Sequence, residues 1–351
     1  MVAFLRGNGL NWLLLFIPVS LAGWAIGWPR LWLFVLAALA LIPLAGLIGS
    51  ATEELGARVG PIYSGLLTAS LGNAPELIIG LFALRAGLTG VVKASISGSL
   101  IGNVLLVLGL SMFVGGWGRE KQVFNRTSAG ANVVMLFLAV VALVMPAVIA
   151  IHAPATVERI SLLVAVVLFL IYLASLVFSL KTHRALFRIK ETTLPPTTLT
   201  LAQAGLILGV ATLFTAIEAE LLVDAVSVAA HALGMTQFFI GVVVVAIVGN
   251  AAEHVSAVQL ARKNKMDLAV TICAGSSTQV ALFVAPVLVF ASLAFGHPLT
   301  LIFNQVEIIG IALSVLVVAI VTLDGESNWF EGLQLTAVYL ILAIVFYFVP
   351  G

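Results

Sequence analysis

Several apolar stretches of roughly 17 to 25 residues, the length that a helix needs to cross a lipid bilayer, constrain this chain more than any other feature of its sequence. The composition agrees with them, because 62% of the residues are hydrophobic and only 9% are charged. The sequence therefore predicts an all-α polytopic membrane protein.

Breaks at charged or turn-rich residues divide the chain into eleven predicted transmembrane helices. They are expected near residues 10–28, 31–51, 62–86, 90–115, 131–151, 160–180, 199–223, 235–262, 266–294, 304–323 and 332–349. The first segment resembles a secretory signal peptide, but it is long enough to span and no small-residue cleavage site follows it. Trp12, Trp24 and Trp28 fit interfacial positions of a membrane helix.

Residues 181–198 are predicted to be a linker between two halves, because they lie in the most polar and proline-bearing stretch, KTHRALFRIKETTLPPTTLT. When the sixteen Lys and Arg residues are assigned to alternate sides of the membrane, one side holds only Arg30, Arg85, Lys93 and Arg159. The other twelve share a side with the N-terminus and the linker. The positive-inside rule therefore predicts a cytoplasmic N-terminus and linker, with the C-terminus on the opposite side.

One short motif occurs twice. Gly72, Asn73, Ala74 and Glu76 recur 177 positions later, in the segment GNAAEH that begins at Gly249. Without gaps, this offset gives nine identities in 39 positions, where roughly four would arise by chance. Polar identities cluster among them, including Ser99 with Ser276. Since each predicted repeat has five helices, an odd number, the two copies should cross the membrane in opposite directions and meet at a substrate site near the midplane.

Glu76 and Glu253 are the acidic residues that lie well inside predicted helices. An ionised carboxylate there needs compensation by a cation, a proton or a positive side chain. Arg85 and Arg262 lie nine residues further along, about 13 Å away on a helix, which is too far. A mobile cation or protons therefore remain as the expected partners.

Two carboxylates match the charge of one divalent ion, and ligation by oxygen alone suits Ca²⁺. Asn73 and Asn250 lie three residues before their glutamates, on the same helix face, as candidate ligands or hydrogen-bond partners. Pro75 should break the first helix and leave carbonyl oxygens free, whereas the second copy depends on Gly249 for any unwinding. Protons and the metal ion would compete for the same oxygens, which is the physical basis of antiport.

Small and polar residues follow each motif, and Ser99, Ser276 and Gln279 are candidates to complete a coordination shell. The two serines could equally serve close helix packing. His254 points about 100° away from Glu253 on a helix, so we expect it to pair with another group. Glu220 and Asp224, one turn apart near the end of the seventh predicted helix, are candidates for its partner or for an entry funnel. Glu53 and Glu54 hold the corresponding place at the end of the second predicted helix, and solvated interfacial charge is the alternative for all four.

Other classes of function lack their sequence signals. The sequence has no basic patch with interleaved aromatic residues, which would indicate nucleic-acid binding, and no phosphate-binding loop, which would indicate ATP binding. Its single cysteine, Cys273, excludes an intramolecular disulfide. No cofactor is expected. A passive cation channel would also need acids in its pore, and an intramembrane hydrolase could use paired carboxylates, although no nucleophile accompanies them here.

Six segments in order resemble the calcium/proton exchanger family, within the cation/calcium antiporter superfamily. They are ATEEL (51–55), GNAPELI (72–78), KASISGSLIGNVLLVLGL (93–110), FFIGVVVVAIVGNAAEH (238–254), GSSTQVALFVAP (275–286) and DGESNWFEG (324–332). The match runs from about residue 40 to the C-terminus.

The resemblance implies an accessory first helix (residues 1–30) and two inverted five-helix repeats, residues 31–180 and 199–351. It implies exchange of cytosolic Ca²⁺ for protons, with Glu76 and Glu253 alternately protonated and Ca²⁺-bound. Asn73, Asn250, Ser276 and Gln279 would line the site, with Ser99 as the counterpart of Ser276. We therefore expect an antiporter, not an enzyme, moving at least two protons per ion if both glutamates titrate. The lack of targeting segments and of large soluble extensions favours a prokaryotic plasma membrane. Coupling to sodium is the nearest alternative.

Overall fold

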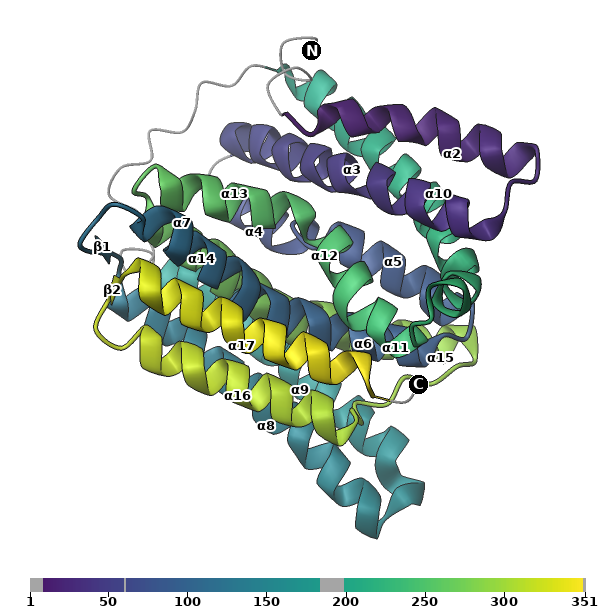
Figure 1. The fold of residues 1–351 in the computed structure, drawn as a ribbon. Helices are drawn as coiled ribbons and strands as arrows, with labels where there is room; N and C mark the ends of the chain where they lie inside the picture. Colours follow the sequence, from purple (N-terminus) through teal and green to yellow (C-terminus); the bar gives the residue numbers. More distant parts are fainter. Residues whose placement is uncertain (1–8, 60, 184–198, 350–351) are drawn as a thin grey trace.

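A computed structural model describes residues 9–59, 61–183 and 199–349, and within them the protein is a bundle of helices with one very short sheet (Figure 1). Most of the predicted linker, residues 184–198, lies outside the described residues. The long apolar segments of the sequence form long helices in the structure, which confirms the prediction made from their bilayer-spanning length.

The helices that lie mainly in the first half of the chain are η1 (Asn11–Leu15), α2 (Phe16–Ala25), α3 (Arg30–Val59), α4 (Pro61–Leu71), α5 (Ala74–Arg85), α6 (Thr89–Ile101), η2 (Gly102–Val107), α7 (Leu108–Gly116), α8 (Arg126–His152), η3 (Pro154–Thr156), α9 (Val157–Val177) and η4 (Phe178–Thr182). Those of the second half are α10 (Leu201–Leu233), α11 (Gln237–Phe239), η5 (Ile240–Val245), α12 (Ala246–Gly249), α13 (Ala251–Arg262), α14 (Met266–Gln279), η6 (Val280–Val284), α15 (Ala285–Phe295), α16 (Gln305–Val321) and α17 (Trp329–Tyr347).

Seven of these helical segments are long and apolar enough to cross a membrane, within the described part of the chain. An eighth candidate is the pair formed by residues 237–249 and 251–262, which is bent by 61° at its break. Shorter apolar helices cover Asn11–Ala25 and Gln305–Val321. The protein is therefore a multi-pass membrane protein by length and composition, while the count of eleven crossings stays a prediction.

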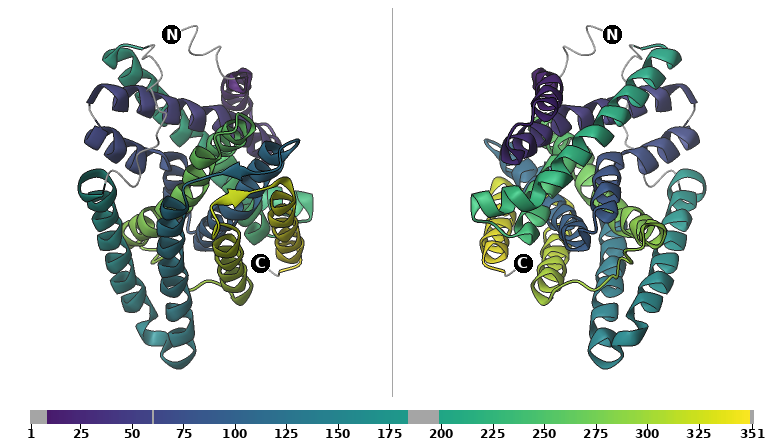
Figure 2. Two further views of the ribbon diagram at one scale, coloured as in Figure 1. Left: turned by 90° about the vertical axis from the view of Figure 1, so that its left-hand side faces the viewer. Right: turned by 90° about the vertical axis from the view of Figure 1, so that its right-hand side faces the viewer.

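The helices α2, α3 and α10 lie together along one side of the bundle, and α16 and α17 lie on the opposite side (Figure 1). Between them pass α5, α6, α7 and the helices from α12 to α14, so these central helices are shielded on both sides. The antiparallel pair α8 and α9 extends beyond the rest of the bundle (Figure 2).

Both copies of the repeated motif interrupt a helix. The first break lies between α4 and α5 at Gly72 and Asn73, just before Pro75, whose missing N–H and ring disfavour a continuous helix. The second lies at Asn250, between α12 and α13, where no proline is present. The predicted first break is thus confirmed, and the second forms at the asparagine that follows Gly249.

A second shared feature follows each motif. The next helical segment after α5, and likewise after α13, contains a π-helical turn: η2 (Gly102–Val107) lies between α6 and α7, and η6 (Val280–Val284) lies between α14 and α15. The two turns overlap at the 177-residue offset. Such turns insert one extra residue and occur mostly as single turns inside α-helices, frequently at functional sites.

At one end of the bundle, β1 (Gln122–Val123) pairs antiparallel with β2 (Glu326–Ser327), with Gln122 opposite Ser327. This short sheet connects the loop before α8 to the loop before α17. The Gln122 side chain donates from Nε2 to Ala261 O and to Asn264 Oδ1, both at 2.9 Å, and so also holds the end of α13.

Two predicted helix ends are wrong. The helix expected near 199–223 continues to Leu233, where Gly234 ends it in the left-handed conformation (φ 65°), because Asp224 lies within the helix instead of ending it. The helix expected near 31–51 continues to Val59, so Glu53 and Glu54 lie inside α3 and not at its end.

Candidate cation site

The two helix breaks bring the motif asparagines into the centre of the bundle. Asn73 and Asn250 are each 1% exposed, and each lies at the residue where one helix ends and the next begins. Glu76 and Glu253 follow in the first turns of α5 and α13. A carboxylate is favoured there, because the free N–H groups and the dipole of a helix N-terminus carry positive partial charge.

Each glutamate lies near the glycine that begins the other copy of the motif. A Cβ built on Gly249 would lie 3.3 Å from Glu76 Oε1, and one built on Gly72 would lie 3.8 Å from Glu253 Oε1. The two carboxylates are close enough to interact electrostatically. The absence of side chains at these glycines therefore leaves room for both carboxylates between the two breaks.

Hydrogen bonds join each motif asparagine to the serine of the other half. Ser276 Oγ donates to Asn73 Oδ1 at 3.1 Å, and Asn250 Nδ2 donates to Ser99 Oγ at 2.9 Å. At the 177-residue offset these two contacts are counterparts of one another. Both serines are buried, and each fixes the amide plane of an asparagine beside a glutamate.

Asn103 connects these residues and was not among the candidates from the sequence. Its Nδ2 donates to Ser276 Oγ at 3.1 Å and to Asn250 Oδ1 at 3.3 Å, and it is 2% exposed. The available signal was its spacing: Asn103 lies four residues after Ser99, on the same helix face, in an otherwise apolar segment. It has no counterpart in the repeat, because position 280 is valine.

Gln279 and His254 add contacts that only one half of the protein has. Asn73 Nδ2 donates to Gln279 Oε1 at 2.7 Å, and His254 Nε2 lies 3.0 Å from Asn103 Oδ1. Gln279 therefore reaches the asparagine of the first motif from α14. The imidazole of His254 is therefore paired with Asn103 and not with Glu253, its neighbour in the sequence.

The two glutamates are incompletely paired by protein groups. Both side chains are partly accessible, yet Oε2 of Glu76 and Oε2 of Glu253 are inaccessible and have no hydrogen-bond partner among the described residues. Buried carboxylate oxygens are costly without a partner. Two carboxylates with amide and hydroxyl oxygens around them form the hard, oxygen-only donor set that Ca²⁺ takes. Within the described residues no group of three His, Cys, Asp or Glu side chains offers a different metal site.

Three of the acids considered from the sequence lie apart from this site. Glu220 pairs with Arg85 at 3.8 Å, and both side chains are more than half exposed, so Glu220 is not the partner of His254. Asp224 accepts a hydrogen bond from Arg30 through its backbone oxygen, at 3.2 Å. Glu54 Oε2 accepts from Leu199 N at 3.4 Å. These contacts hold all three acids away from the two motif asparagines.

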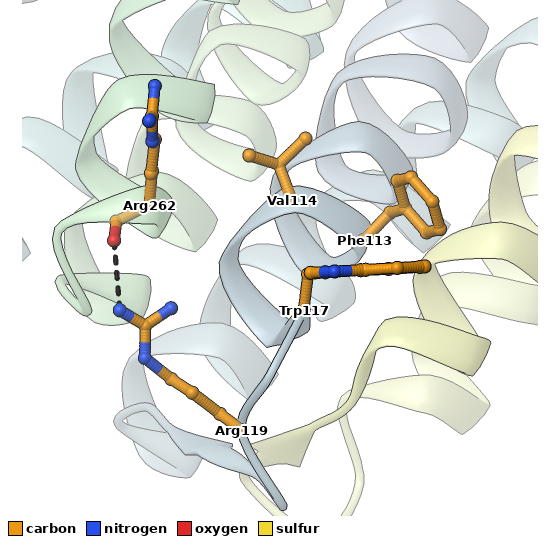
Figure 3. Close-up of a pocket in the computed structure, with 5 residues that line it drawn as sticks. All are labelled: Phe113, Val114, Trp117, Arg119 and Arg262. Carbon is orange, nitrogen blue, oxygen red and sulfur yellow. Dashed lines mark hydrogen bonds between the residues drawn. The ribbon is translucent and has the colours of Figure 1, made fainter.

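A pocket of about 400 Å³ lies at the ends of α7 and α13, and is lined by Phe113, Val114, Trp117, Arg119 and Arg262 (Figure 3). Arg119 donates to the backbone oxygen of Arg262 at 3.1 Å, and the Arg262 side chain points away from Arg119. Neither motif glutamate lines the pocket, which is therefore distinct from the candidate cation site.

Comparison with known proteins assigns the chain to a family. A family model described as sodium/calcium exchanger protein matches residues 30–181 and 203–348. A Ca²⁺/H⁺ antiporter of Aphanothece halophytica is 43% identical over 360 residues, which cover 96% of each chain. The Ca²⁺/H⁺ antiporter ChaA of Bacillus subtilis is 43% identical over 339 residues, which cover 94% of this chain and 96% of the relative.

Solved structures agree in fold. The structure of native YfkE matches with a TM-score of 0.85 and 41% identity, covering 97% of this chain and 100% of that one. The H⁺/Ca²⁺ exchanger CAX matches with a TM-score of 0.75 over 96% of this chain and 91% of that one. At 17% identity, this second likeness shows the fold alone.

Proposed function

The chain belongs to the sodium/calcium exchanger protein family, and from this premise we propose that it is a secondary active antiporter that exchanges cytosolic Ca²⁺ for protons. Relatives that are 43% identical over nearly their whole length are Ca²⁺/H⁺ antiporters, and this likeness supports the same exchange here. The substrates are thus Ca²⁺ and protons, with no cofactor.

One observation carries the proposal for the site: Glu76 and Glu253 each lie near the glycine of the other motif copy and each have an unpaired, inaccessible carboxylate oxygen. A pair of negative charges in such surroundings needs either a divalent cation or protons. The same oxygens cannot hold both at once. Ca²⁺ binding therefore requires that protons leave, and protonation requires that Ca²⁺ leaves.

The surrounding polar residues would position the carboxylates and contribute neutral oxygen ligands. The helix breaks at Asn73 and Asn250 support this role for the two asparagines, and the hydrogen bonds of Ser276, Ser99 and Gln279 to these asparagines support it for the other three. Hydrogen-bonded amides and hydroxyls are pre-oriented, so less conformational entropy is lost when an ion binds.

The matched breaks and π-helical turns support two inverted repeats, residues 31–180 and 199–351, after an accessory helix in residues 1–30. Eleven crossings would place the N-terminus and the linker, residues 181–198, in the cytoplasm and the C-terminus outside, in a prokaryotic plasma membrane. Because the repeats would run antiparallel, exchange of their conformations opens the shared site first to one side and then to the other.

Transport by the purified protein in liposomes tests the proposal. Ca²⁺ movement should follow an imposed pH gradient, and Glu76→Gln or Glu253→Gln should abolish it, because a neutral amide can neither release a proton nor balance a cation. Glu158→Gln, at an exposed acid in the first turn of α9, is the matched control and should transport normally. Proton-driven Ca²⁺ flux that survives both glutamine substitutions would contradict the assignment of the site.

Sodium coupling is the second candidate, because the matching family model is described by sodium/calcium exchange. Uptake driven separately by Na⁺ and H⁺ gradients distinguishes the two. A passive channel would instead conduct Ca²⁺ without either gradient, at single-channel rates.

A further inference from the structure

A third acid is buried in the bundle, outside the candidate cation site. Glu218 lies in the interior of α10 and is 0% exposed, and its Oε1 is 2.6 Å from Ser20 Oγ on α2, which is also 0% exposed. This contact joins two helices that are 198 residues apart in sequence. The hydrogen bonds of Glu218 and Ser20 do not reach the network around Asn103.

Counting hydrogens shows which group donates. Ser20 Oγ carries one hydrogen but lies within bonding distance of two acceptors, Ile17 O at 2.8 Å and Glu218 Oε1 at 2.6 Å. An ionised carboxylate only accepts, so the hydroxyl could then satisfy one contact and not both. Both contacts form together if Glu218 is a carboxylic acid that donates from Oε1 to Ser20 Oγ, while Ser20 donates to Ile17 O.

The surroundings of Glu218 supply no compensating charge. Within the described residues no basic group lies within ion-pair distance of it, and Glu218 Oε2 is inaccessible without a partner. Thr215 Oγ1, three residues earlier on the same helix face, is also buried and without a partner. An uncompensated charge at such a place is far more costly than a neutral acid.

The arginines of the neighbouring helices are engaged with other groups. Arg30 and Arg58 of α3 bond to backbone oxygens of Asp224 and Leu199, and Arg85 of α5 pairs with Glu220. The remaining ionisable groups of α3, α5 and α10 are Glu53, Glu54, Glu76, Asp224 and His231, and α2 and α11 contain none. A further acid nearby would only add to the cost of charge on Glu218.

We propose that Glu218 is a resident proton-binding site, separate from Glu76 and Glu253, and that its carboxylic acid is the hydrogen-bonded link between α2 and α10. Its proton is not among those exchanged for the cation, because both Glu218 and Ser20 are closed to solvent. The charge state of Glu218 can be tested whichever ions are transported, whereas the separation of its proton from the exchange rests on the proposed function.

Infrared spectroscopy of the purified full-length protein at neutral pH tests the protonation directly. The spectrum of the wild type minus that of Glu218→Gln should contain the carbonyl stretch of a protonated carboxylic acid. Glu158→Gln, at an exposed acid, should instead remove the bands of an ionised carboxylate. Carboxylate bands in the Glu218 difference spectrum would overturn the proposal.

Two further measurements keep the test decisive. Ser20→Ala removes the acceptor of the proposed hydrogen bond, so the carbonyl band of the Glu218 acid should shift in frequency. A band that does not move would contradict the link between α2 and α10. This measurement decides the link even if Glu218→Gln fails to fold. In liposomes, Glu218→Gln should leave the number of protons exchanged per Ca²⁺ unchanged. A changed ratio would show that this proton is transported.

Discussion

Gly249 lies directly against the side chain of Glu76: a Cβ built on Gly249 would lie 3.2 Å from Glu76 Cγ and 3.3 Å from Glu76 Oε1. Contacts this short are tighter than ordinary packing, so any side chain at position 249 must displace the carboxylate. The glycine is therefore explained by the group it faces from the other half of the chain, in addition to its place before the helix break.

Substitution of Gly249 by alanine should impair transport without removing any ligand. One methyl group would shift Glu76 by a few tenths of an ångström, and we expect the apparent affinity for Ca²⁺ to fall about tenfold, equivalent to about 1.4 kcal/mol. Initial rates of Ca²⁺ uptake into liposomes over a range of concentrations measure the change. Gly205→Ala, where a Cβ meets no atom within 4 Å, is the control. Equal affinities in the two variants would contradict the contact.

Ser276 should matter more than its repeat counterpart Ser99. Ser276 contacts Asn73, Asn103 and Asn250, whereas Ser99 only accepts from Asn250, whose Nδ2 also donates to Ala246 O at 2.9 Å.

Ser276→Ala removes the donor to Asn73 Oδ1, at a cost of about 1–3 kcal/mol for a group left unpaired, while Asn103 and Asn250 keep their bond to each other. Ser99→Ala leaves Asn250 Nδ2 with another acceptor, Ala246 O. The ratio of the apparent Ca²⁺ affinities of the two alanine variants is the measurement. A larger loss in Ser99→Ala would reverse the expected asymmetry.

Asn103 should contribute to stability as well as to transport. Asn103→Leu keeps the number and branching of the side-chain heavy atoms but removes the donor to Ser276 and Asn250 and the acceptor beside His254. Because those groups stay buried, we expect the free energy of unfolding to fall by about 1–3 kcal/mol and the unfolding temperature to fall with it.

Thermal unfolding in detergent measures this, with Ser95→Ala as a control that removes only a hydrogen bond to a backbone oxygen of its own helix, Val92 O. If the two variants unfold at the same temperature, Asn103 does not hold the network together.

The sequence predicts the membrane segments and the motif pair well, because each depends on local composition or on identity between two segments. Apolar length alone locates the long helices, and Pro75 marks the first break. The sequence does not identify Asn103 as a site residue, because it has no counterpart in the repeat. Its role depends on hydrogen bonds to residues about 150 and 170 positions away.

Glu218 escapes for a different reason. In the sequence, Asp224 follows a long apolar segment and so predicts the end of a membrane helix, which puts Glu218, six residues earlier, near the predicted helix end. The apolar sequence from Ala225 to Leu233, followed by Gly234, is the signal that the helix continues to a glycine cap. Burial of Glu218 further depends on α2, far away in sequence, which no local pattern specifies.

The second helix break should tolerate a proline where the first already has one. Ala252 is the second residue of α13, as Pro75 is of α5, and the first N–H groups of a helix have no partner within it. Ala252→Pro should therefore change the unfolding free energy by less than about 1 kcal/mol and preserve Ca²⁺ uptake. Ala257→Pro, in the middle of the same helix, should cost about 3 kcal/mol or more and abolish uptake, because it removes an internal hydrogen bond. Unfolding temperature and uptake measured together decide the matter: if Ala252→Pro is as damaging as Ala257→Pro, then α12 and α13 do not act as two helices separated at Asn250.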